Sequence, residues 1–161
     1  MTDSVDIRMA RLDDAAHIAL MSRDFIEDGL GWRWTPARVA ACMRDGAMNV
    51  VVAEADAQLA GFGIMQYRDL EAHLMLFGVV PALRRRAVGS RLLHWLEQVA
   101  TVAGIELIFL EARLANRAAR EFYRAHGYRE LGVMQRYYSG REDAVRIGKD
   151  LTATPLPVPP P

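Results

Sequence analysis

An apolar strand leads into an amphipathic helix through an arginine-rich turn, and this junction constrains the fold more than any other part of the chain. The strand ends at Val79-Val80-Pro81, the turn runs Ala82-Leu83-Arg84-Arg85-Arg86-Ala87, and the helix begins at Val88-Gly89-Ser90. The first N–H groups of a helix lack internal partners and carry partial positive charge, and arginines add charge-assisted hydrogen bonds. The turn therefore predicts a phosphate-binding unit of an α/β protein, although an arginine run is also typical of a solvated surface.

The segment after the turn indicates a helix that packs against a core. Its apolar residues recur at helical spacing: Val88, Leu92, Leu93, Trp95, Leu96, Val99, Ala100, Val102 and Ala103. Polar residues such as Arg91, His94 and Gln98 take the opposite face, and Gly104 is placed to end the helix.

The rest of the chain predicts the order β-α-α-β-β-β-α-β-α-β-β. We expect strands over 5–10, 49–55, 59–68, 72–80, 105–112, 128–138 and 144–151, and further helices over 12–23, 35–44 and 116–126. Asp13 and Asp14 are expected to open the first helix, Thr35 to cap the second, and 25–34 to form an aromatic-rich loop. The predicted fold is mixed α/β, with about seven strands and four helices in one domain over residues 1–151 and a disordered, proline-rich tail over 152–161.

Charge and cysteine content limit the possible functions. Twenty basic and 20 acidic residues give a formal net charge of zero, which argues against nucleic-acid binding. The single cysteine, Cys42, excludes an internal disulfide framework and a thiolate zinc cluster, so no metal is expected. No apolar run approaches membrane-spanning length, and the acidic N-terminus lacks the pattern of a secretion signal. We therefore expect a cytoplasmic protein without a membrane partner.

The junction, written as Val79-x-Pro81-x-x-Arg84-x-x-Ala87-x-Gly89-x-x-Leu92-Leu93, resembles the acetyl-coenzyme A signature of the GNAT N-acetyltransferase superfamily. The predicted order of elements is similar to the GNAT fold from about residue 5 to 151. The resemblance implies that acetyl-CoA is the cosubstrate, with its pyrophosphate held by Arg84, Arg85, Arg86, Ala87, Val88, Gly89 and Ser90, and its pantetheine paired with the backbone of Phe77, Gly78 and Val79. Ala87 stands where the first glycine is usual, and its Cβ is expected to narrow the space for the pyrophosphate or to need a φ below zero.

The segments 110–116 and 122–128 resemble the second half of GNAT enzymes, most closely the bacterial ribosomal-protein N-terminal alanine acetyltransferases. The resemblance implies that Glu111 is the general base, that Asn116 binds the pantetheine, and that Tyr123 protonates the departing thiolate. His73, at a strand position where several GNAT branches carry a catalytic residue, is a second candidate for the base. Partial burial is expected to raise the pKa of Glu111.

From the residues alone, each of these side chains also has an ordinary structural interpretation. Glu111 suits an ion pair with Arg113 or a neighbouring arginine, Asn116 a helix N-cap, and Tyr123 a core aromatic whose hydroxyl has a hydrogen-bond partner. His73 is also compatible with a plain polar position near the start of a strand.

The last hairpin is similar to the tyrosine-bearing hairpin that holds a peptide in N-terminal acetyltransferases. Tyr137 and Tyr138 are the matching residues, and Trp32 and Trp34 are candidates for the opposite wall of the site. The resemblance implies acetyl transfer to the α-amine of a protein or peptide. A small-molecule amine as acceptor and a non-catalytic acyl-CoA sensor are the alternatives. A homodimer formed through the edge of the last strands is also expected.

Overall fold

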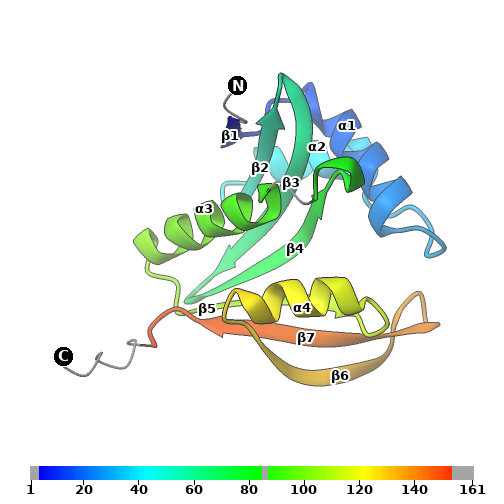
Figure 1. The fold of residues 1–161 in the computed structure, drawn as a ribbon, viewed down its shortest axis with the longest axis vertical. Coiled ribbons are helices and arrows are strands. Elements are labelled where there is room, and N and C mark those ends of the chain that lie inside the picture. The colour runs from blue at the N-terminus through cyan, green and yellow to red at the C-terminus, as the bar shows by residue number, and fades with distance from the viewer. Residues whose placement is uncertain (1–3, 85–86, 154–161) are drawn as a thin grey trace.

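The computed structural model describes residues 4–84 and 87–153, so Arg85, Arg86 and residues 154–161 of the expected tail lie outside it. Within that part the chain forms one seven-stranded sheet in the order β1-β2-β3-β4-β5-β7-β6 (Figure 1). The strands are β1 (Val5–Met9), β2 (Met48–Ala55), β3 (Gln58–Arg68), β4 (Glu71–Val79), β5 (Leu107–Arg113), β6 (Arg129–Tyr138) and β7 (Glu142–Asp150). The four α-helices are α1 (Asp14–Met21), α2 (Pro36–Arg44), α3 (Val88–Val102) and α4 (Arg117–Ala125). The predicted mixed sheet with seven strands and four helices is confirmed.

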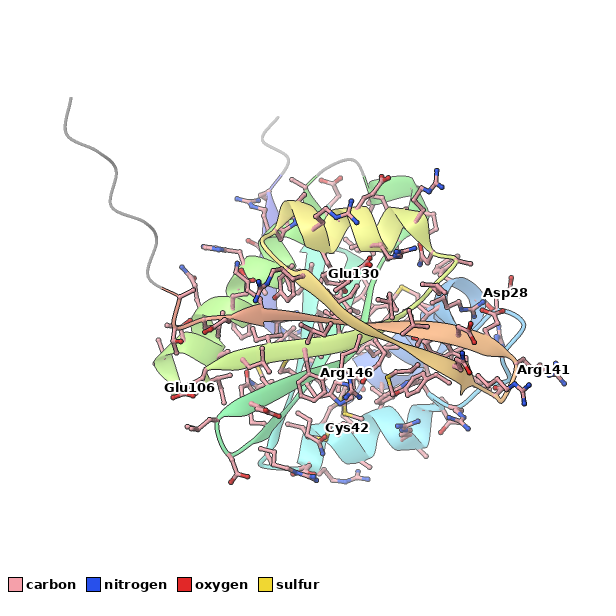
Figure 2. All side chains as sticks on the ribbon, turned by 90° about the horizontal axis from the view of Figure 1, so that it is seen from below. Asp28, Cys42, Glu106, Glu130, Arg141 and Arg146 are labelled. Atoms are coloured by element: carbon pink, nitrogen blue, oxygen red, sulfur yellow. The ribbon has the colours of Figure 1, made fainter. Side chains whose placement is uncertain are left out.

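Two separate apolar clusters cover the two faces of the sheet. Buried side chains of α3 and α4 share one cluster with one face of the strands. Buried side chains of α1 and α2 form the other cluster on the opposite face. Figure 2 shows α4 and α2 on opposite sides of β5 and β7. The sheet is therefore the middle layer of three, and each face meets a different pair of helices.

Helix α3 follows its apolar stripe except at the end. Leu92, Leu93 and Leu96 are fully buried, but Val102 is 90% exposed, so the predicted core position at Val102 is wrong. An apolar stripe indicates which face of a helix turns inward, but it does not indicate where the sheet beneath that helix ends. Gly104 follows with a φ of +82°, a left-handed conformation that glycine adopts without strain and that ends the helix as predicted.

The first two helices begin differently. Thr35 caps α2 as predicted, because its Oγ1 accepts the N–H of Arg38 at 3.3 Å. At α1 the side chain of Asp13 makes no capping bond; the carboxylate of Asp14 instead accepts the N–H of Arg11 at 2.7 Å. After α1 the chain continues as a π-helix, η1 (Ser22–Ile26), so part of the expected loop is helical.

The parallel pair in the middle of the sheet is short. β4 and β5 pair only from Glu71 with Leu107 to His73 with Phe109, and beyond that point the two strands diverge (Figure 1). β4 continues toward a short 3₁₀ helix, η2 (Pro81–Leu83), which leads to α3. The divergence leaves a wedge between the two halves of the sheet. Within the described part of the chain, no helix has the length and apolar character needed to cross a membrane.

Candidate active site

A cavity of about 1360 Å³ occupies the wedge between β4 and β5. Most of the residues singled out from the sequence line this cleft: Trp34, His73, Phe77, Gly78, Val79, Arg84, Ala87, Gly89, Ser90, Glu111, Asn116, Tyr123, Tyr137 and Tyr138. Cavities for one small ligand usually measure about 300–1000 Å³, so the cleft has room for a large ligand and an acceptor together.

Two of the expected residues do not line the cleft. The side chain of Val88 is fully buried in the core beneath α3. Trp32 points elsewhere, because its Nε1 donates to the carbonyl oxygen of Ala19 at 3.1 Å and the Arg23 guanidinium lies 5.5 Å from its ring centroid. Trp34 is 7% exposed and packs into the cluster beneath α1 and α2 while it also faces the cleft. Only one of the two tryptophans is thus part of the cleft wall.

The start of α3 has the features of an anion site. Among the residues that the structure describes, no side chain caps this helix, and the N–H of Arg91 donates to the carbonyl oxygen of Ala87 at 3.1 Å. The first turn of such a helix has N–H groups that can bind a phosphate. Ala87 has a φ of +61°, so the turn keeps the left-handed conformation that glycine usually supplies, and of the two expected consequences of alanine here the negative φ is not adopted. The other, a narrower space for the pyrophosphate, stays a prediction.

The neighbouring backbone leaves space for an extended ligand. Beyond His73, β4 pairs with β3 on one edge only, so part of its N–H and C=O groups face the cleft. A Cβ built on Gly89 would lie 3.3 Å from the ring of Phe122, which shows how closely α3 and α4 approach at the cleft. A free strand edge beside an uncapped helix fits a pantetheine arm that ends in a pyrophosphate.

His73 and Glu111, which the sequence offered as alternative bases, bind each other. His73 Nε2 lies 2.6 Å from Glu111 Oε2, and Arg146 donates from Nη2 to Glu111 Oε1 at 2.7 Å. The ring of His73 stacks on Phe109 with centroids 4.5 Å apart. Arg146 was not anticipated from the sequence; it lies opposite Glu111 in the pairing of β5 with β7, and Figure 2 shows its side chain on the α2 side of the sheet. The ion-pair interpretation of Glu111 is confirmed, with Arg146 as its arginine.

The pKa of Glu111 is lowered, which corrects the expectation that burial would raise it. Burial does act to raise this pKa, since the side chain is only 5% exposed. The hydrogen bonds from His73 and Arg146, with their charges, outweigh that effect. Glu111 is therefore held as a carboxylate whose two oxygens are both oriented by partners on neighbouring strands.

Tyr123 reaches the cleft from the other face of the sheet. It is 5% exposed and packs edge-on against Phe122 and Tyr128, so its core position is confirmed, but the expected partner for its hydroxyl is not found among the described residues. Burial raises its pKa, which keeps the hydroxyl protonated. None of the described residues hydrogen-bonds to that hydroxyl, although the residue lines the cleft. At the start of α4, Asn116 Oδ1 accepts the N–H of Ala119 at 3.1 Å, which confirms its interpretation as an N-cap.

The segment between α1 and α2 closes the cleft on the side opposite α4. Arg113 donates to the carbonyl oxygens of Ile26 and Asp28 at 2.7 and 2.8 Å, and Ser139 donates to that of Leu30 at 2.7 Å. Figure 2 shows Asp28 at the same end of the molecule as Arg141 in the β6–β7 hairpin. The segment and the hairpin thus form one wall.

The buried carboxylate of Glu27 holds this wall in shape. It accepts the hydroxyl of Ser22 at 2.9 Å and the N–H groups of Arg33 and Trp34 at 2.7 and 3.2 Å. Glu27 was not anticipated from the sequence, because a single acidic residue in a loop gives no periodic signal.

The strand β5 separates the two sets of side chains. Leu110 and Ala112 turn toward the cluster that contains Tyr123, so Glu111 and Arg113 point to the opposite face. One wall of the cleft thus carries a protonated hydroxyl, and the other carries a carboxylate bound to an imidazole. Among the described residues no three His, Cys, Asp or Glu side chains gather closely enough to hold a metal ion, and a metal-free site stays a prediction.

Comparison with known proteins places this arrangement among acetyltransferases. Residues 15–128 match the acetyltransferase (GNAT) family. The [ribosomal protein bS18]-alanine N-acetyltransferase of Salmonella typhimurium is 35% identical over 56% of this chain, which spans 64% of that protein's length. The protein of the same name from Escherichia coli K12 is 30% identical over 70% of this chain and 77% of its own. A crystal structure of the ribosomal-protein-S18-alanine N-acetyltransferase from Escherichia coli superposes with a TM-score of 0.79 at 24% identity, over 96% of this chain and 99% of that one.

Proposed function

Since the chain belongs to the acetyltransferase (GNAT) family, we propose that it transfers an acetyl group from acetyl-CoA directly to the α-amine of a protein or peptide. The observation that carries this proposal is the pairing of Glu111 with His73 on one wall of the cleft, opposite the protonated Tyr123 on the other. Amide formation from a thioester needs a base for the amine and an acid for the thiolate, and the cleft offers both.

The cosubstrate would lie along the α3 and α4 side of the cleft. The free edge of β4 at Phe77, Gly78 and Val79 would pair with the pantetheine, and the first turn of α3 from Ala87 to Ser90 would hold the pyrophosphate. Arg84 also lines the cleft beside this turn. Arg85 and Arg86 were expected to share this role but lie outside the described residues. Asn116 would keep its cap while it faces the pantetheine.

The acceptor would lie against the wall that Glu27, Arg113 and Ser139 hold in place. Tyr137, Tyr138 and Trp34 line this side. Glu111 or His73, which act as one hydrogen-bonded pair, would take the proton as the ammonium N–H bond breaks. The nitrogen lone pair then attacks the thioester carbonyl carbon, and the Tyr123 hydroxyl gives its proton to sulfur as the carbon–sulfur bond breaks. The attacking nitrogen loses its second proton as the amide forms, and this proton returns to the Tyr123 oxygen. An N-terminal α-amine, with an ordinary pKa of about 7.7–8.0, loses its proton more readily than a lysine.

Direct transfer also fits the position of the single cysteine. Cys42 is buried in α2, burial raises the pKa of its thiol, and it does not line the cleft. A buried, protonated thiol is a poor nucleophile, so an acetyl-cysteine intermediate at Cys42 is not part of the proposal.

The test is release of CoA thiol from acetyl-CoA in the presence of peptides that begin with alanine or serine. The matched control is the same peptide with a blocked N-terminus, and a panel of polyamines represents small-molecule acceptors. We expect thiol release that requires the free α-amine. Turnover with polyamines alone would mean that the acceptor is a small-molecule amine and not a peptide. Binding of acetyl-CoA without turnover on any acceptor would identify an acyl-CoA sensor.

A further inference from the structure

His126 bridges α4 to the first turn of α3. It follows the last residue of α4, where its Nδ1 lies 2.7 Å from the carbonyl oxygen of Phe122. Its Nε2 lies 3.0 Å from Oγ of Ser90, and Ser90 lines the cleft at the start of α3. One ring thus connects the backbone of α4 to a hydroxyl beside the proposed pyrophosphate position.

The direction of these hydrogen bonds depends on the charge of the ring. A carbonyl oxygen only accepts, so Nδ1 must carry a hydrogen. In a neutral ring Nε2 then has only a lone pair, and Ser90 must donate its single hydroxyl hydrogen to His126. A phosphate oxygen also only accepts, so Ser90 then has nothing to donate to it. In a protonated ring Nε2–H donates to Oγ, and the hydroxyl hydrogen of Ser90 is free for the phosphate.

We propose that acetyl-CoA binds with uptake of a proton by His126, which acts as a positioning residue that turns the Ser90 hydroxyl toward the pyrophosphate. This inference rests on the proposed function, because it takes CoA as the ligand of the cleft. Electrostatics acts in the same direction as the hydrogen bonds. A negative pyrophosphate at the start of α3 favours the imidazolium over the neutral ring.

Within residues 4–84 and 87–153, the charged groups around the ring come from three elements. Lys149 of β7 donates from Nζ to the carbonyl oxygen of His126 at 2.9 Å and to Glu97 of α3 at 3.0 Å, so this positive charge is paired. Arg91 and His94 on α3 and Arg124 on α4 are exposed to solvent. A ligand charge at Ser90 is therefore the main change that the ring meets on binding.

Proton uptake on binding makes the affinity for CoA depend on pH. Because a proton binds together with the ligand, this affinity is highest at low pH and falls as pH rises. The dissociation constant weakens by up to about tenfold per pH unit, since one proton is coupled to one ligand.

Isothermal titration calorimetry in buffers of different ionisation enthalpy tests this proposal. The probe is 3′-dephospho-CoA, which lacks the phosphate monoester that would itself titrate near pH 6–7. Near pH 7 we expect net proton uptake with a dissociation constant that weakens from pH 6 to pH 8. His126→Gln should abolish both the proton uptake and the pH dependence of the dissociation constant, and Ser90→Ala should reduce them. His94→Gln, at an exposed histidine on α3, the helix of Ser90, should leave them intact. Circular dichroism of each variant checks that it is folded.

Two results would overturn the inference while the proposed function survives. One is binding of 3′-dephospho-CoA to the unmodified protein with no proton uptake at any pH from 6 to 8. The other is uptake that persists undiminished in folded His126→Gln. If neither CoA nor 3′-dephospho-CoA binds, the proposed function itself is wrong, and this inference fails with it.

Discussion

The backbone at Ala87 has a conformation that alanine tolerates poorly. Its φ of +61° lies in the left-handed region, which costs a residue with a Cβ about 1–2 kcal/mol. We expect Ala87→Gly to raise the free energy of unfolding by about 1 kcal/mol, because relief of this strain outweighs the added entropy of the unfolded chain. Removal of the Cβ should also tighten binding of CoA. Urea unfolding and calorimetric titration measure the two effects.

The control is Ala103→Gly at the other end of α3. Ala103 has an ordinary φ of −75°, so glycine there should destabilise the protein by about 0.5–1 kcal/mol. If both substitutions change the stability in the same direction, the strain at Ala87 does not explain the effect.

Glu111 and His73 should behave as a unit in catalysis. We expect Glu111→Gln and His73→Gln each to lower kcat/KM by at least about 100-fold, because an amide in either position takes no proton from the amine. The double variant should lose little more than either single variant, since each change already disables the pair. Steady-state kinetics with a fixed peptide acceptor checks this. Losses that multiply in the double variant would mean that the two residues act independently.

Tyr123 should affect the chemical step and not cosubstrate binding. Burial keeps its hydroxyl protonated, so we expect Tyr123→Phe to lower kcat by about 10–100-fold while the dissociation constant of CoA stays within twofold. No alkaline limb from this hydroxyl should appear below about pH 10. The matched control is Tyr67→Phe, since Tyr67 lies outside the cleft and binds Asn49 at 3.0 Å. Unchanged turnover in Tyr123→Phe would remove this tyrosine as the acid.

At the scale of elements, the conformation of the segment between α1 and α2 depends on the carboxylate of Glu27. Glu27→Ala leaves the N–H groups of Arg33 and Trp34 without their acceptor, at a cost of about 1–3 kcal/mol. We expect the KM for the acceptor to rise by at least about tenfold and the dissociation constant of CoA to change little. Asp24→Ala, at an exposed acidic residue of η1, serves as the control. Equal changes in the KM for the acceptor and in the dissociation constant of CoA would show that this segment does not act on acceptor binding alone.

The sequence predicts the elements well because each carries its own local signal. Alternation marks the strands, Thr35 and Gly104 mark helix ends, and apolar spacing marks the buried face of α3. The failures occur where the outcome depends on the surroundings. Val102 is apolar but lies beyond the sheet, and Asp13 stands at a cap position while Asp14 makes the bond. Local pattern gives no information about either.

The candidate site was predictable as a set of residues but not as an arrangement. Resemblance pointed to Glu111 and His73 separately, whereas their contact follows from the short parallel register between β4 and β5. The partner Arg146 follows from the pairing of β5 with β7. These long-range registers also decide the pKa of Glu111, which is why burial alone gave the wrong direction. Glu27 had no sequence signal at all.

At the scale of the whole molecule, the sheet consists of two halves joined at a narrow seam. β1 to β4 form one half, β5 to β7 form the other, and three residue pairs connect them. The pair of His73 and Glu111 lies at the end of this seam, with Arg146 beside it. The proposed catalytic pair thus also joins the two halves of the sheet. The last strand of the sheet, β6, exposes Leu131 and Val133, but a homodimer through this edge stays a prediction, as does a cytoplasmic location.

The position of Glu111 at this seam predicts how the stability of the fold responds to acid. Two largely buried carboxylates with lowered pKa join different elements: Glu111 across the seam, and Asp14, which joins α1 to β1 through Arg8 at 2.8 Å. Burial opposes ionisation in both, but their hydrogen bonds outweigh it. A carboxyl group whose pKa is lower in the folded state than in the unfolded state stabilises the fold. This stability is fully present above the unfolded-state pKa of about 4 and is lost as pH falls through the folded-state pKa.

We therefore expect the free energy of unfolding, measured with urea, to stay level from pH 7 to pH 5 and to fall by about 1–2 kcal/mol between pH 5 and pH 3. The double variant Asp14→Asn with Glu111→Gln should be less stable at pH 7 but should lose less on acidification, because it has fewer depressed groups to protonate. Asp24→Asn, at an exposed surface position, should follow the unmodified protein. An identical acid slope in the double variant would mean that other carboxylates control the acid stability of the fold and that the seam does not depend on the charge of Glu111.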